Sequence, residues 1–566
     1  MTFSPHHDYL TEEIGPDGHP VRYRLDCPDD FNFAYDVVDR LGRLEPDRLA
    51  LRWSDQHGAR ADYSFADVAD LSDRAAAYFA SLGIAPGDRV LVILKRRPEF
   101  WWALLGLHKL GAVALPATHL LKAYDLVYRL RQANIVAVVA TLEADGLARE
   151  VELAEAELAL NGAPRPLNLG AHGRRPGWLD FDLGLAQAPP WTRPATCQRI
   201  GDPMLAYFTS GTTADPKLVT HDFAYPIAHI PTAKYWQRVD PDGLHLTVSE
   251  SGWAKAVWGK LYGQWLMAAA VDVYDFDRFD PRQLLDHIVA AGVTSFCAAP
   301  TVYRFLIGCD LKAWDLSRLT HCAIAGEAMN PVVYETFRDL TGIELKEAYG
   351  QTETTATVMT PYWLKTKAGS MGQPSPAYDV VLLTADGSQA TPGQEGEICL
   401  RADPPAAGGR RQLGLFQGYV GDDRLTAQVW HDGFYHTRDL ALRDQDGYLW
   451  YVGRTDDMIK TSGYRVSPFE VESVVLQHPA VREVAVTGVY DEVRGAVIKA
   501  TVVPHHPQEA GEALAADIKA FVKSRTAPYK YPRLIEFCDQ LPMTISGKIR
   551  RGEIRRRDAL AAAGAV

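Results

Sequence analysis

Nine residues from Thr209 to Lys217 combine four hydroxyl side chains, one glycine and a final lysine, with no bulky apolar side chain. They follow an apolar run, Met204–Phe208, that predicts a short buried strand. Hydroxyl and backbone N–H groups on a turn can donate to phosphate oxygens, and a lysine adds positive charge. Leu218 follows the lysine, so the spacing is not that of a P-loop. The segment indicates either a phosphate-binding loop of another architecture or a surface loop rich in Ser and Thr.

A second polar segment, Ala348–Thr354, places a glycine beside hydroxyls and a carboxylate. Gly350 permits a ligand to approach the backbone closely, and Glu353 offers oxygen atoms to a hard cation such as Mg²⁺. Further along, Asp439 follows a strand-like run and could accept hydrogen bonds from both hydroxyls of a ribose. Each segment also has a purely structural interpretation. It could be a turn or a strand end whose polar side chains form hydrogen bonds with the local backbone.

Three basic residues near the C-terminus could bind an anionic ligand. Arg454 and Arg465 flank a charged stretch and could pair with phosphate or with surface carboxylates. Lys548 follows Ser546 and Gly547, a pair that predicts a flexible loop. Movement of such a loop could bring the lysine to a carboxylate or phosphate and take it away again. Surface lysines are common, so this position alone does not decide between a functional and a solvated side chain.

Length and composition narrow the class of protein. A chain of 566 residues exceeds what one hydrophobic core usually spans, so at least two domains are expected. The net charge of −12 argues against general nucleic-acid binding, which needs a concentrated basic face. The first residues lack the basic and apolar regions of a signal peptide, so a cytoplasmic location is expected.

The apolar and cysteine-containing segments indicate neither a membrane span nor a metal site. The most apolar region, Trp101–Leu121, contains His108, Lys109 and a proline, which predicts a buried helix and strand. The cysteines show no C-x-x-C spacing and are expected to be reduced thiols. They are Cys27, Cys197, Cys297, Cys309, Cys322, Cys399 and Cys538.

The order of patterns predicts an α/β protein with largely parallel sheets. Strand-like runs at 89–94, 135–140 and 293–298 alternate with helical patterns at 98–110 and 282–291. Between about 380 and 449, short runs broken by Gly, Asp and Pro predict antiparallel strands. The tail mixes strands at 484–489 and 498–503 with a helix at 512–525, enough for a small α+β domain. The short basic end, 550–557, is interpreted as a solvated helix face.

Taken in order along the chain, these signals resemble the adenylate-forming (AMP-binding) acyl-CoA synthetases, from about residue 30 to 560. The medium-chain branch is the most similar in its motifs, which are carried here by residues 251–255, 325–328, 462–466 and 527–533. The resemblance implies a large N-terminal AMP-binding domain with a small β subdomain (1–453), a hinge (454–457) and a small mobile α+β lid domain (458–566). It also implies an acid–thiol ligase that uses ATP, Mg²⁺ and coenzyme A.

The implied reaction has two steps and assigns a role to each motif. A carboxylate attacks the α-phosphorus of ATP to give an acyl-adenylate and pyrophosphate, and coenzyme A then displaces AMP. Lys548 would bridge the acyl carboxylate and the α-phosphate, and Glu353 would hold Mg²⁺; with Thr352, these are the expected catalytic residues. The ATP-binding residues would be Thr209, Ser210, Gly211, Thr212, Thr213, Lys217, Gly326, Glu327, Glu347, Ala348, Tyr349, Gly350, Gln351, Thr352, Asp439, Arg454, Arg465 and Lys548.

In this family the C-terminal domain rotates between the two steps, and Asp456 matches the hinge position. The rotation would withdraw Lys548 and present another loop to coenzyme A. Residues at positions that match coenzyme A contacts are Ser462, Gly463, Tyr464, Arg494, Lys523 and Tyr531. Two places depart from the family pattern. The phosphate loop has Ala214 and Asp215 where relatives mostly carry glycine and a neutral or basic residue, and Arg438 stands where relatives usually carry glycine.

The resemblance also predicts the size of the carboxylic acid that the enzyme uses. In acetate-specific relatives a tryptophan occupies the position of Gly350, so larger acids should fit here, and Trp253 is expected to line the same cavity. A medium-chain, branched or aromatic carboxylic acid is therefore the expected substrate. Two alternatives stay open: an enzyme that loads a carrier-protein phosphopantetheine, and a non-catalytic nucleotide-binding relative. The sequence leaves the oligomeric state open, with a homodimer as one option.

Overall fold

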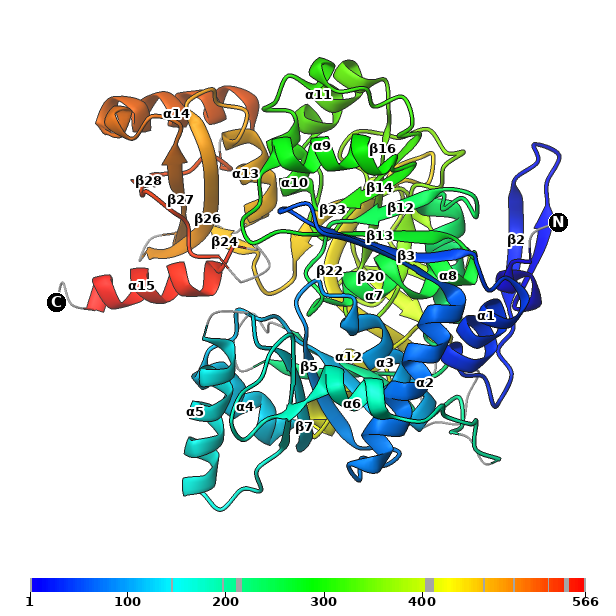
Figure 1. The fold of residues 1–566 in the computed structure, drawn as a ribbon. Coiled ribbons are helices and arrows are strands. Elements are labelled where there is room, and N and C mark those ends of the chain that lie inside the picture. The colour runs from blue at the N-terminus through cyan, green and yellow to red at the C-terminus, as the bar shows by residue number, and fades with distance from the viewer. Residues whose placement is uncertain are drawn as a thin grey trace. The chain divides into compact units, whose positions relative to one another are not determined.

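The computed structural model describes residues 3–143, 146–195, 198–209, 216–402, 412–461, 464–491, 494–527, 529–543 and 549–563. These residues form two compact units, shown in Figure 1. Unit 1 takes its described residues from 1–210, 216–379 and 401–435, and unit 2 takes them from 380–400 and 436–566. The predicted domain boundaries at 453 and 458 stay predictions.

Unit 1 contains a seven-stranded sheet that is parallel except for one hairpin at its edge. Apolar side chains from both faces of the inner strands are buried, as expected for a sheet covered on both sides. In spatial order the strands are β11 (Lys217–Asp222), β10 (Pro203–Thr209), β6 (Val113–Pro116), β5 (Arg89–Ile93), β7 (Ile135–Thr141), β8 (Leu167–Ala171) and β9 (Leu179–Asp180).

A nine-stranded sheet in the same unit is parallel in its centre, from β16 to β3. Its ends are antiparallel. In spatial order the strands are β18 (Gln373–Pro374), β17 (Ala356–Met359), β16 (Leu345–Gly350), β15 (His321–Ala325), β14 (Ser295–Ala298), β12 (Leu244–Thr247), β13 (Ala270–Asp275), β3 (Leu49–Asp55) and β4 (Arg60–Ser64).

Capping residues define the ends of several helices in unit 1. Ser64 and Asp67 form a capping box at the start of α2 (Phe65–Ser81). Asp280 caps α9 (Pro281–Ala291), which ends at Gly292 with a left-handed φ of 71°. The other helices of this unit are α1 (Arg40–Leu44), α3 (Glu99–Leu110), α4 (Ala123–Gln132), α5 (Leu147–Leu160), α6 (Phe181–Gln187), α7 (Ala254–Lys260), α8 (Tyr262–Leu266), α10 (Pro300–Leu306), α11 (Pro331–Thr341) and α12 (Asp423–Val429). A separate hairpin of β1 (Leu10–Ile14) and β2 (Pro20–Leu25) lies near the N-terminus (Figure 1).

Short strands form a third sheet after residue 379, as the sequence predicts. They are β19 (Val380–Leu383), β20 (Glu395–Arg401), β22 (Phe434–Arg443) and β21 (Trp430–His431), with β23 (Leu449–Arg454) paired to β22. The paired residues of β19 and β20, of β21 and β22, and of β22 and β23 run antiparallel. Strand β22 is continuous, beginning in unit 1 and ending in unit 2.

The C-terminal part of unit 2 has its own core, with valine and isoleucine side chains buried between strands and helices. Its elements are β24 (Ile459–Thr461), β25 (Tyr464–Val466), α13 (Pro468–Val475), β26 (Val481–Asp491), β27 (Gly495–Pro504), α14 (Glu512–Arg525), β28 (Leu534–Phe537) and α15 (Arg551–Ala563). Helix α15, red in Figure 1, contains most of the basic end. Arg551 makes two hydrogen bonds, of 3.0 and 2.6 Å, to the buried carboxylate of Glu472, so this helix is not simply solvated.

The predicted α/β class with parallel sheets is confirmed. The stretch predicted as buried helix and strand contains α3 and β6, both buried. Among the described residues, no helix combines the length and the apolar character needed to cross a membrane.

Candidate functional site

The phosphate-loop candidate joins the two strands of the β10–β11 hairpin. Thr209 and Lys217 are register partners, so the two ends of the segment lie opposite one another. Both side chains are half-buried, and the Tyr128 hydroxyl donates to the Pro216 carbonyl oxygen at 2.9 Å. Ser210, Gly211, Thr212, Thr213 and the divergent Asp215 lie outside the described residues.

Tyr419 contacts side chains from two predicted motifs. Its hydroxyl donates a 2.8 Å hydrogen bond to Oε1 of Glu353. The Lys217 ammonium lies 5.2 Å from the centroid of the same ring, within range of a cation–π contact. The structure therefore brings the lysine of the phosphate loop and the carboxylate predicted to hold Mg²⁺ to one buried tyrosine.

Backbone pairing holds Tyr419 at this place. The segment that contains it runs beside β11: Gln417 N–H donates to Thr220 O at 2.9 Å, and Val420 N–H donates to Leu218 O at 2.9 Å. The Phe416 N–H donates to the Glu353 backbone oxygen at 2.8 Å. These bonds fix the ring between β11 and the turn that contains Glu353.

A buried histidine supports the same turn. His221, on β11, contacts the Thr352 carbonyl oxygen through Nε2 at 2.6 Å. A carbonyl can only accept, so Nε2 carries the proton. Burial lowers the pKa of His221 to about 4, which keeps the ring neutral near pH 7. Its ring stacks on Tyr225 with centroids 3.9 Å apart, so both its hydrogen bond and its packing position Thr352.

The rest of the turn is closed by its own polar groups. The Gln351 N–H donates to Thr354 Oγ1 at 3.0 Å, and Thr354 N–H donates to the Gln351 carbonyl oxygen at 3.2 Å. The Tyr435 hydroxyl donates to Gln351 Oε1 at 2.7 Å. Residues 351–354 thus form an ordered turn directly after β16.

Gly350 has a steric role that the sequence did not reveal. A Cβ at this position would lie 2.2 Å from the Thr355 carbonyl oxygen, so any side chain here requires a backbone shift. The β16–β17 register changes between Tyr349 and Gly350, which explains the close approach. The expectation that this glycine simply leaves pocket volume open is therefore incomplete, and its part in an acyl pocket stays a prediction.

The predicted adenine segments lie at the carboxyl ends of neighbouring parallel strands. Ala325 and Ala348 are register partners on β15 and β16, so Gly326 and Glu327 follow one strand while Tyr349 and Gly350 end the other. This edge of a parallel sheet is where α/β proteins commonly bind ligands. Gly326 has a φ of 107°, which favours glycine. Glu327 accepts a 3.0 Å hydrogen bond from Thr301.

Glu347, one of the predicted ATP-binding residues, lies on β16 with a buried side chain. Its Oε1 accepts from the Met329 N–H at 3.4 Å. Burial raises the pKa of Glu347 to about 8, so the carboxyl is largely protonated at neutral pH. A neutral carboxyl next to the adenine segment can donate as well as accept a hydrogen bond.

The acyl-pocket candidate Trp253 is half-buried and directly precedes α7. Two residues later, the Lys255 ammonium donates to the Ala325 carbonyl oxygen at 2.9 Å. This bond ties the segment containing Trp253 to the residue before Gly326. The structure thus places the acyl and adenine candidates of unit 1 on connected segments.

The ribose candidates Asp439 and Arg454 lie together in unit 2. They are register partners on β22 and β23, with Arg454 Nη1 3.7 Å from Asp439 Oδ1. The Tyr451 hydroxyl donates to the same Asp439 oxygen at 3.3 Å. Arg454 Nε also donates to Asp456, the hinge candidate, at 3.2 Å.

Arg438, which departs from the family's glycine, has a φ of 62°. This left-handed conformation explains why glycine is favoured at the position. The Arg438 N–H donates to Glu397 Oε1 at 2.7 Å, which offsets part of the strain.

Four residues around the coenzyme A candidates of unit 2 form one aromatic pair and one aromatic–cationic pair. Tyr464 is half-exposed and stacks on Tyr529 with centroids 4.1 Å apart. Lys523 lies 5.3 Å from the centroid of Tyr531. Arg494 lies just before β27, its N–H bonded to Asp491. Ser462, Gly463 and Lys548 lie outside the described residues, as does the side chain of Arg465, whose backbone belongs to β25.

Comparison with known proteins decides the family. The model of the AMP-binding enzyme family matches residues 38–419, and that of the AMP-binding enzyme C-terminal domain matches residues 470–548. The chain belongs to the AMP-binding enzyme family. It is 36% identical to mitochondrial acyl-coenzyme A synthetase ACSM3 of Mus musculus, over 95% of this chain and 92% of the relative. It is 38% identical to mitochondrial acyl-coenzyme A synthetase ACSM4 of Homo sapiens, over 94% of this chain and 91% of the relative.

A solved structure supports the same assignment for this AMP-binding enzyme. The anthranilate CoA ligase AuaEII in complex with anthranoyl-AMP is similar with a TM-score of 0.84 and 27% identity, covering 95% of this chain and 99% of that chain. The predicted membership of the adenylate-forming superfamily, in its acyl-CoA synthetase-like branch, is confirmed.

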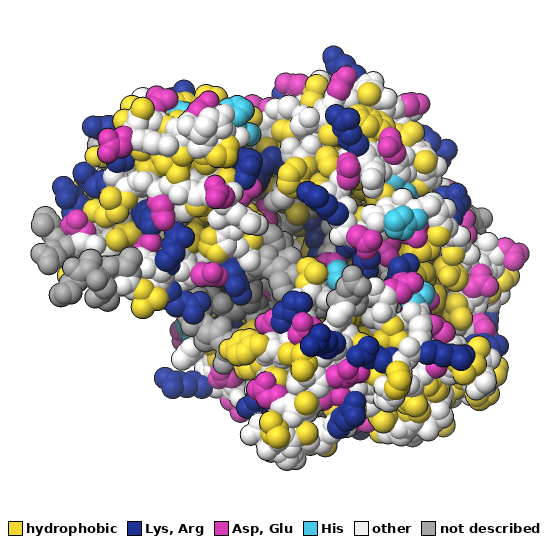
Figure 2. All heavy atoms as spheres, turned by 60° about the vertical axis from the view of Figure 1, so that its left-hand side comes forward, with side chains coloured by type: hydrophobic (Ala, Val, Ile, Leu, Met, Phe, Trp, Pro, Cys, Tyr) yellow, Lys and Arg dark blue, Asp and Glu magenta, His cyan; other side chains and the backbone are white. Residues whose placement is uncertain are grey.

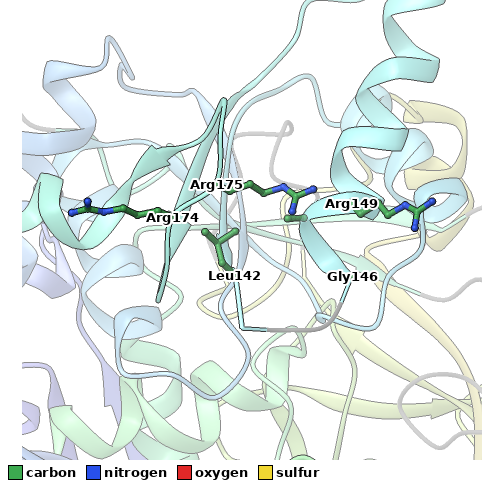
Figure 3. A pocket seen from close by; sticks show the side chains of 6 residues that line it. Leu142, Gly146, Arg149, Arg174 and Arg175 are labelled. Carbon is green, nitrogen blue, oxygen red and sulfur yellow. The ribbon is translucent and has the colours of Figure 1, made fainter.

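A surface pocket of this AMP-binding enzyme is lined by none of the predicted site residues. Its volume is about 140 Å³, and Figure 3 shows Arg149 on α5 and Arg174 and Arg175 on a separate segment. Arg174 pairs with Asp180 at 3.1 Å, and Arg175 makes hydrogen bonds of 2.6 and 2.7 Å to Glu152. Carboxylates therefore neutralise two of the three cations, and the pocket is not an anion site. On the face drawn in Figure 2, basic and acidic side chains are interspersed.

Sequence reasoning missed two groups that support the site, Tyr419 and His221. Tyr419 is separated from Glu353 by 66 positions, and backbone bonds of its segment to β11 and to Glu353 itself bring them together. A polar residue in the apolar run after the phosphate loop was the one available signal for His221.

Proposed function

We propose that the protein is an AMP-forming acyl-CoA synthetase that converts a carboxylic acid, ATP and coenzyme A to an acyl-CoA, AMP and pyrophosphate. The observation that carries this proposal is the grouping of Lys217 and Glu353 around Tyr419 in unit 1. A cation at the end of a hydroxyl-rich loop and a carboxylate on one aromatic ring suit a metal-bound triphosphate.

Glu353 is the proposed ligand of Mg²⁺. Its carboxylate offers hard oxygen, the donor this ion prefers, and the Tyr419 hydroxyl fixes its orientation. When bound, Mg²⁺ would neutralise part of the negative charge on the phosphate oxygens. Lys217 would pair with the β- and γ-phosphates, and the Thr352 hydroxyl would donate to the α-phosphate.

In the first step, a carboxylate oxygen of the substrate attacks the α-phosphorus, and the bond to the β-phosphate oxygen breaks to release pyrophosphate. Lys548 is proposed to stabilise the charge that develops between the two reactants. In the second step, the thiolate of coenzyme A attacks the acyl carbonyl carbon and AMP leaves with the electron pair of the acyl–oxygen bond.

Asp439 is the proposed ribose ligand of unit 2. Its side chain is buried, and Tyr451 and Arg454 hold one carboxylate oxygen at 3.3 and 3.7 Å. A carboxylate fixed in this way can accept from two vicinal hydroxyls. The stacked pair Tyr464–Tyr529 and the cation–π pair Lys523–Tyr531 are proposed to contact coenzyme A, whose adenine ring and phosphates suit stacking and positive charge.

The proposed acid is medium-chain, branched or aromatic. Support comes from the half-buried Trp253 and its connection through Lys255 to the adenine segment. The structural relative named above is an anthranilate CoA ligase, which activates an aromatic acid. The cytoplasmic location and the oligomeric state, a homodimer included, stay predictions.

A panel of carboxylates tests the function. Acids from acetate to octanoate, with benzoate and branched acids, are assayed for pyrophosphate exchange without coenzyme A and for AMP release with it. The proposal expects both activities with the same acids. Exchange without AMP release, restored by a phosphopantetheine carrier protein, would favour the carrier-loading alternative. No exchange with any acid, despite ATP binding, would favour a non-catalytic relative.

A further inference from the structure

Three potential metal ligands of different chemistry meet on β20 and β22 of unit 2. Glu397 and Cys399 are two residues apart on β20, so their side chains lie on the same face of the strand. His436 lies on the neighbouring strand β22. One carboxylate oxygen, the Cys399 sulfur and one imidazole nitrogen all lie within 4.8 Å of one another.

The distances match the edges of a small coordination polyhedron. His436 Nδ1 lies 3.2 Å from Glu397 Oε2 and 3.4 Å from Cys399 Sγ. Metal bonds of about 2.0–2.1 Å to nitrogen, about 2.0–2.2 Å to oxygen and about 2.3 Å to sulfur put tetrahedral neighbours about 3.4–3.6 Å apart. The third edge, between the Glu397 oxygen and the Cys399 sulfur, is at most 4.8 Å long, so one ion could contact all three atoms after small rotations of the side chains.

A group of three side chains joined by hydrogen bonds alone, without a metal ion, is the competing interpretation. In that case the imidazole donates to Glu397, and Cys399 is an inert buried thiol. A single Nδ1–H is directed at one acceptor, however, whereas sulfur and carboxylate both lie close to this nitrogen. An ion at the centre would use all three atoms at once.

The protonation of the thiol is compatible with metal uptake. Burial, and next the Glu397 carboxylate, raise the pKa of Cys399, so the free thiol is protonated at neutral pH. A thiol that coordinates a metal loses its proton, so uptake would release this proton to the buffer. His436 and Glu397 are half-buried, which gives an ion a route to the buried sulfur.

We propose that Glu397, Cys399 and His436 form a binding site for a thiophilic divalent cation, Zn²⁺, with a fourth position left for water. A thiolate, an imidazole and one carboxylate are ligands that zinc accepts, whereas Mg²⁺ prefers oxygen alone. The lack of C-x-x-C spacing does not bear on this group, because strand pairing rather than proximity along the chain unites its members.

The proposed metal site lies next to the strand residue that is proposed to bind the ribose, Asp439. Glu397 Oε1 accepts from the Arg438 N–H at 2.7 Å, and Thr437 Oγ1 donates to the Ile398 carbonyl oxygen at 2.7 Å. These bonds join the two strands immediately before Asp439. A bound ion would add a further link between β20 and β22 at this point.

Zinc titration of the full-length protein, freed of metal by chelation, tests the proposal. Calorimetry is run on the wild type, Cys399→Val, His436→Gln and a matched control, Cys538→Ser, which changes a half-buried thiol of unit 2 outside the group. The wild type and the control should bind one equivalent of Zn²⁺ that excess Mg²⁺ does not displace. Affinity should fall at least about 100-fold in the other two variants.

Two readouts keep the test independent of catalysis and of variant folding. Co²⁺ bound to the wild type should show a thiolate-to-metal absorption band that Cys399→Val lacks. Zn²⁺ should also raise the melting temperature of the wild type, because it binds the folded state. Equal zinc uptake by wild type and Cys399→Val, or no specific uptake by the wild type, would overturn the site.

Discussion

The hydroxyl of Tyr419 donates a 2.8 Å hydrogen bond to the carboxylate of Glu353, and the same ring lies 5.2 Å from the Lys217 ammonium. One buried side chain thus orients an anionic and a cationic group that the proposed reaction uses on the same triphosphate. A hydrogen bond to an ionised carboxylate is worth about 1.5–3 kcal/mol, enough to hold Glu353 in one orientation.

Tyr419→Phe should weaken the use of Mg·ATP. The substitution removes the hydroxyl and keeps the ring near Lys217, so only the orientation of Glu353 is lost. We expect kcat/KM for Mg·ATP to fall about tenfold or more, since about 1.4 kcal/mol corresponds to a factor of ten. The half-saturating Mg²⁺ concentration should rise in the same assay.

Tyr435→Phe is the matched control for this prediction. It removes a comparable hydroxyl, which donates to Gln351 rather than to the carboxylate. This variant should leave the Mg²⁺ dependence unchanged. If both variants shift the Mg²⁺ dependence equally, Tyr419 has no special relation to the metal ligand.

His221→Phe should slow adenylation. Phenylalanine retains a ring to stack on Tyr225 but cannot donate to the Thr352 carbonyl oxygen, so that oxygen loses a 2.6 Å bond. Leaving a buried acceptor unsatisfied costs about 1–3 kcal/mol, and we expect pyrophosphate exchange to slow about tenfold or more. Because the pKa of His221 is about 4, the pH profile between 6 and 9 should keep its shape. A rate equal to that of the wild type would show that Thr352 needs no such support.

Much of the fold could be predicted because the patterns that specify it are local. Alternating strand and helix signals predicted β5, α3, β7 and α9 closely, since buried parallel strands show as apolar runs and helices as a different apolar periodicity. Asp439 and Arg454 were both identified from sequence, but their pairing depends on the β22–β23 register.

The support around the site could not be predicted, because it depends on contacts between distant segments. Tyr419 meets Glu353 through backbone bonds of its segment to β11 and to Glu353, and no motif marks it. Gly350 was interpreted through the volume of its missing side chain, whereas the structure shows a backbone oxygen occupying that space. The unusual Arg438 was recognised from the family pattern, and its left-handed φ of 62° supplies the physical reason.

Glu347→Gln should change how stability depends on pH. The folded pKa of about 8 lies above the ordinary value of 4.5, so the folded state holds a proton that the unfolded state releases. This contribution is fully present below about pH 4.5 and is lost as the pH rises through 8, by at most about 1.4 kcal/mol per pH unit.

Glutamine resembles the neutral carboxyl and does not titrate, so the variant escapes this loss. Melting temperatures measured between pH 5 and 9 should diverge as the pH rises, with the variant progressively more stable relative to the wild type, and the difference should level off above about pH 8. Parallel curves over that range would mean that Glu347 ionises normally in the folded protein.

Lys548→Ala should separate the two half-reactions. The proposed transition-state partner of the acyl carboxylate and the α-phosphate is lost, so pyrophosphate exchange should fall about 100-fold or more. Thioester formation from supplied acyl-adenylate and coenzyme A should change much less, because that step does not use this lysine. An equal loss in both half-reactions would remove the assigned role.

Gly350→Ala should destabilise unit 1 whatever acid the enzyme uses. The added Cβ would lie 2.2 Å from the Thr355 carbonyl oxygen, so β16 and β17 must move apart. Such overpacking typically costs about 1–3 kcal/mol, which should appear as a lower melting temperature. Gly342→Ala is a useful comparison, because its Cβ meets nothing within 4 Å and its cost comes only from a φ of 75°. Full stability of Gly350→Ala would show that the turn can accept a side chain. The interpretation that this glycine leaves volume open for the acyl group would then be favoured.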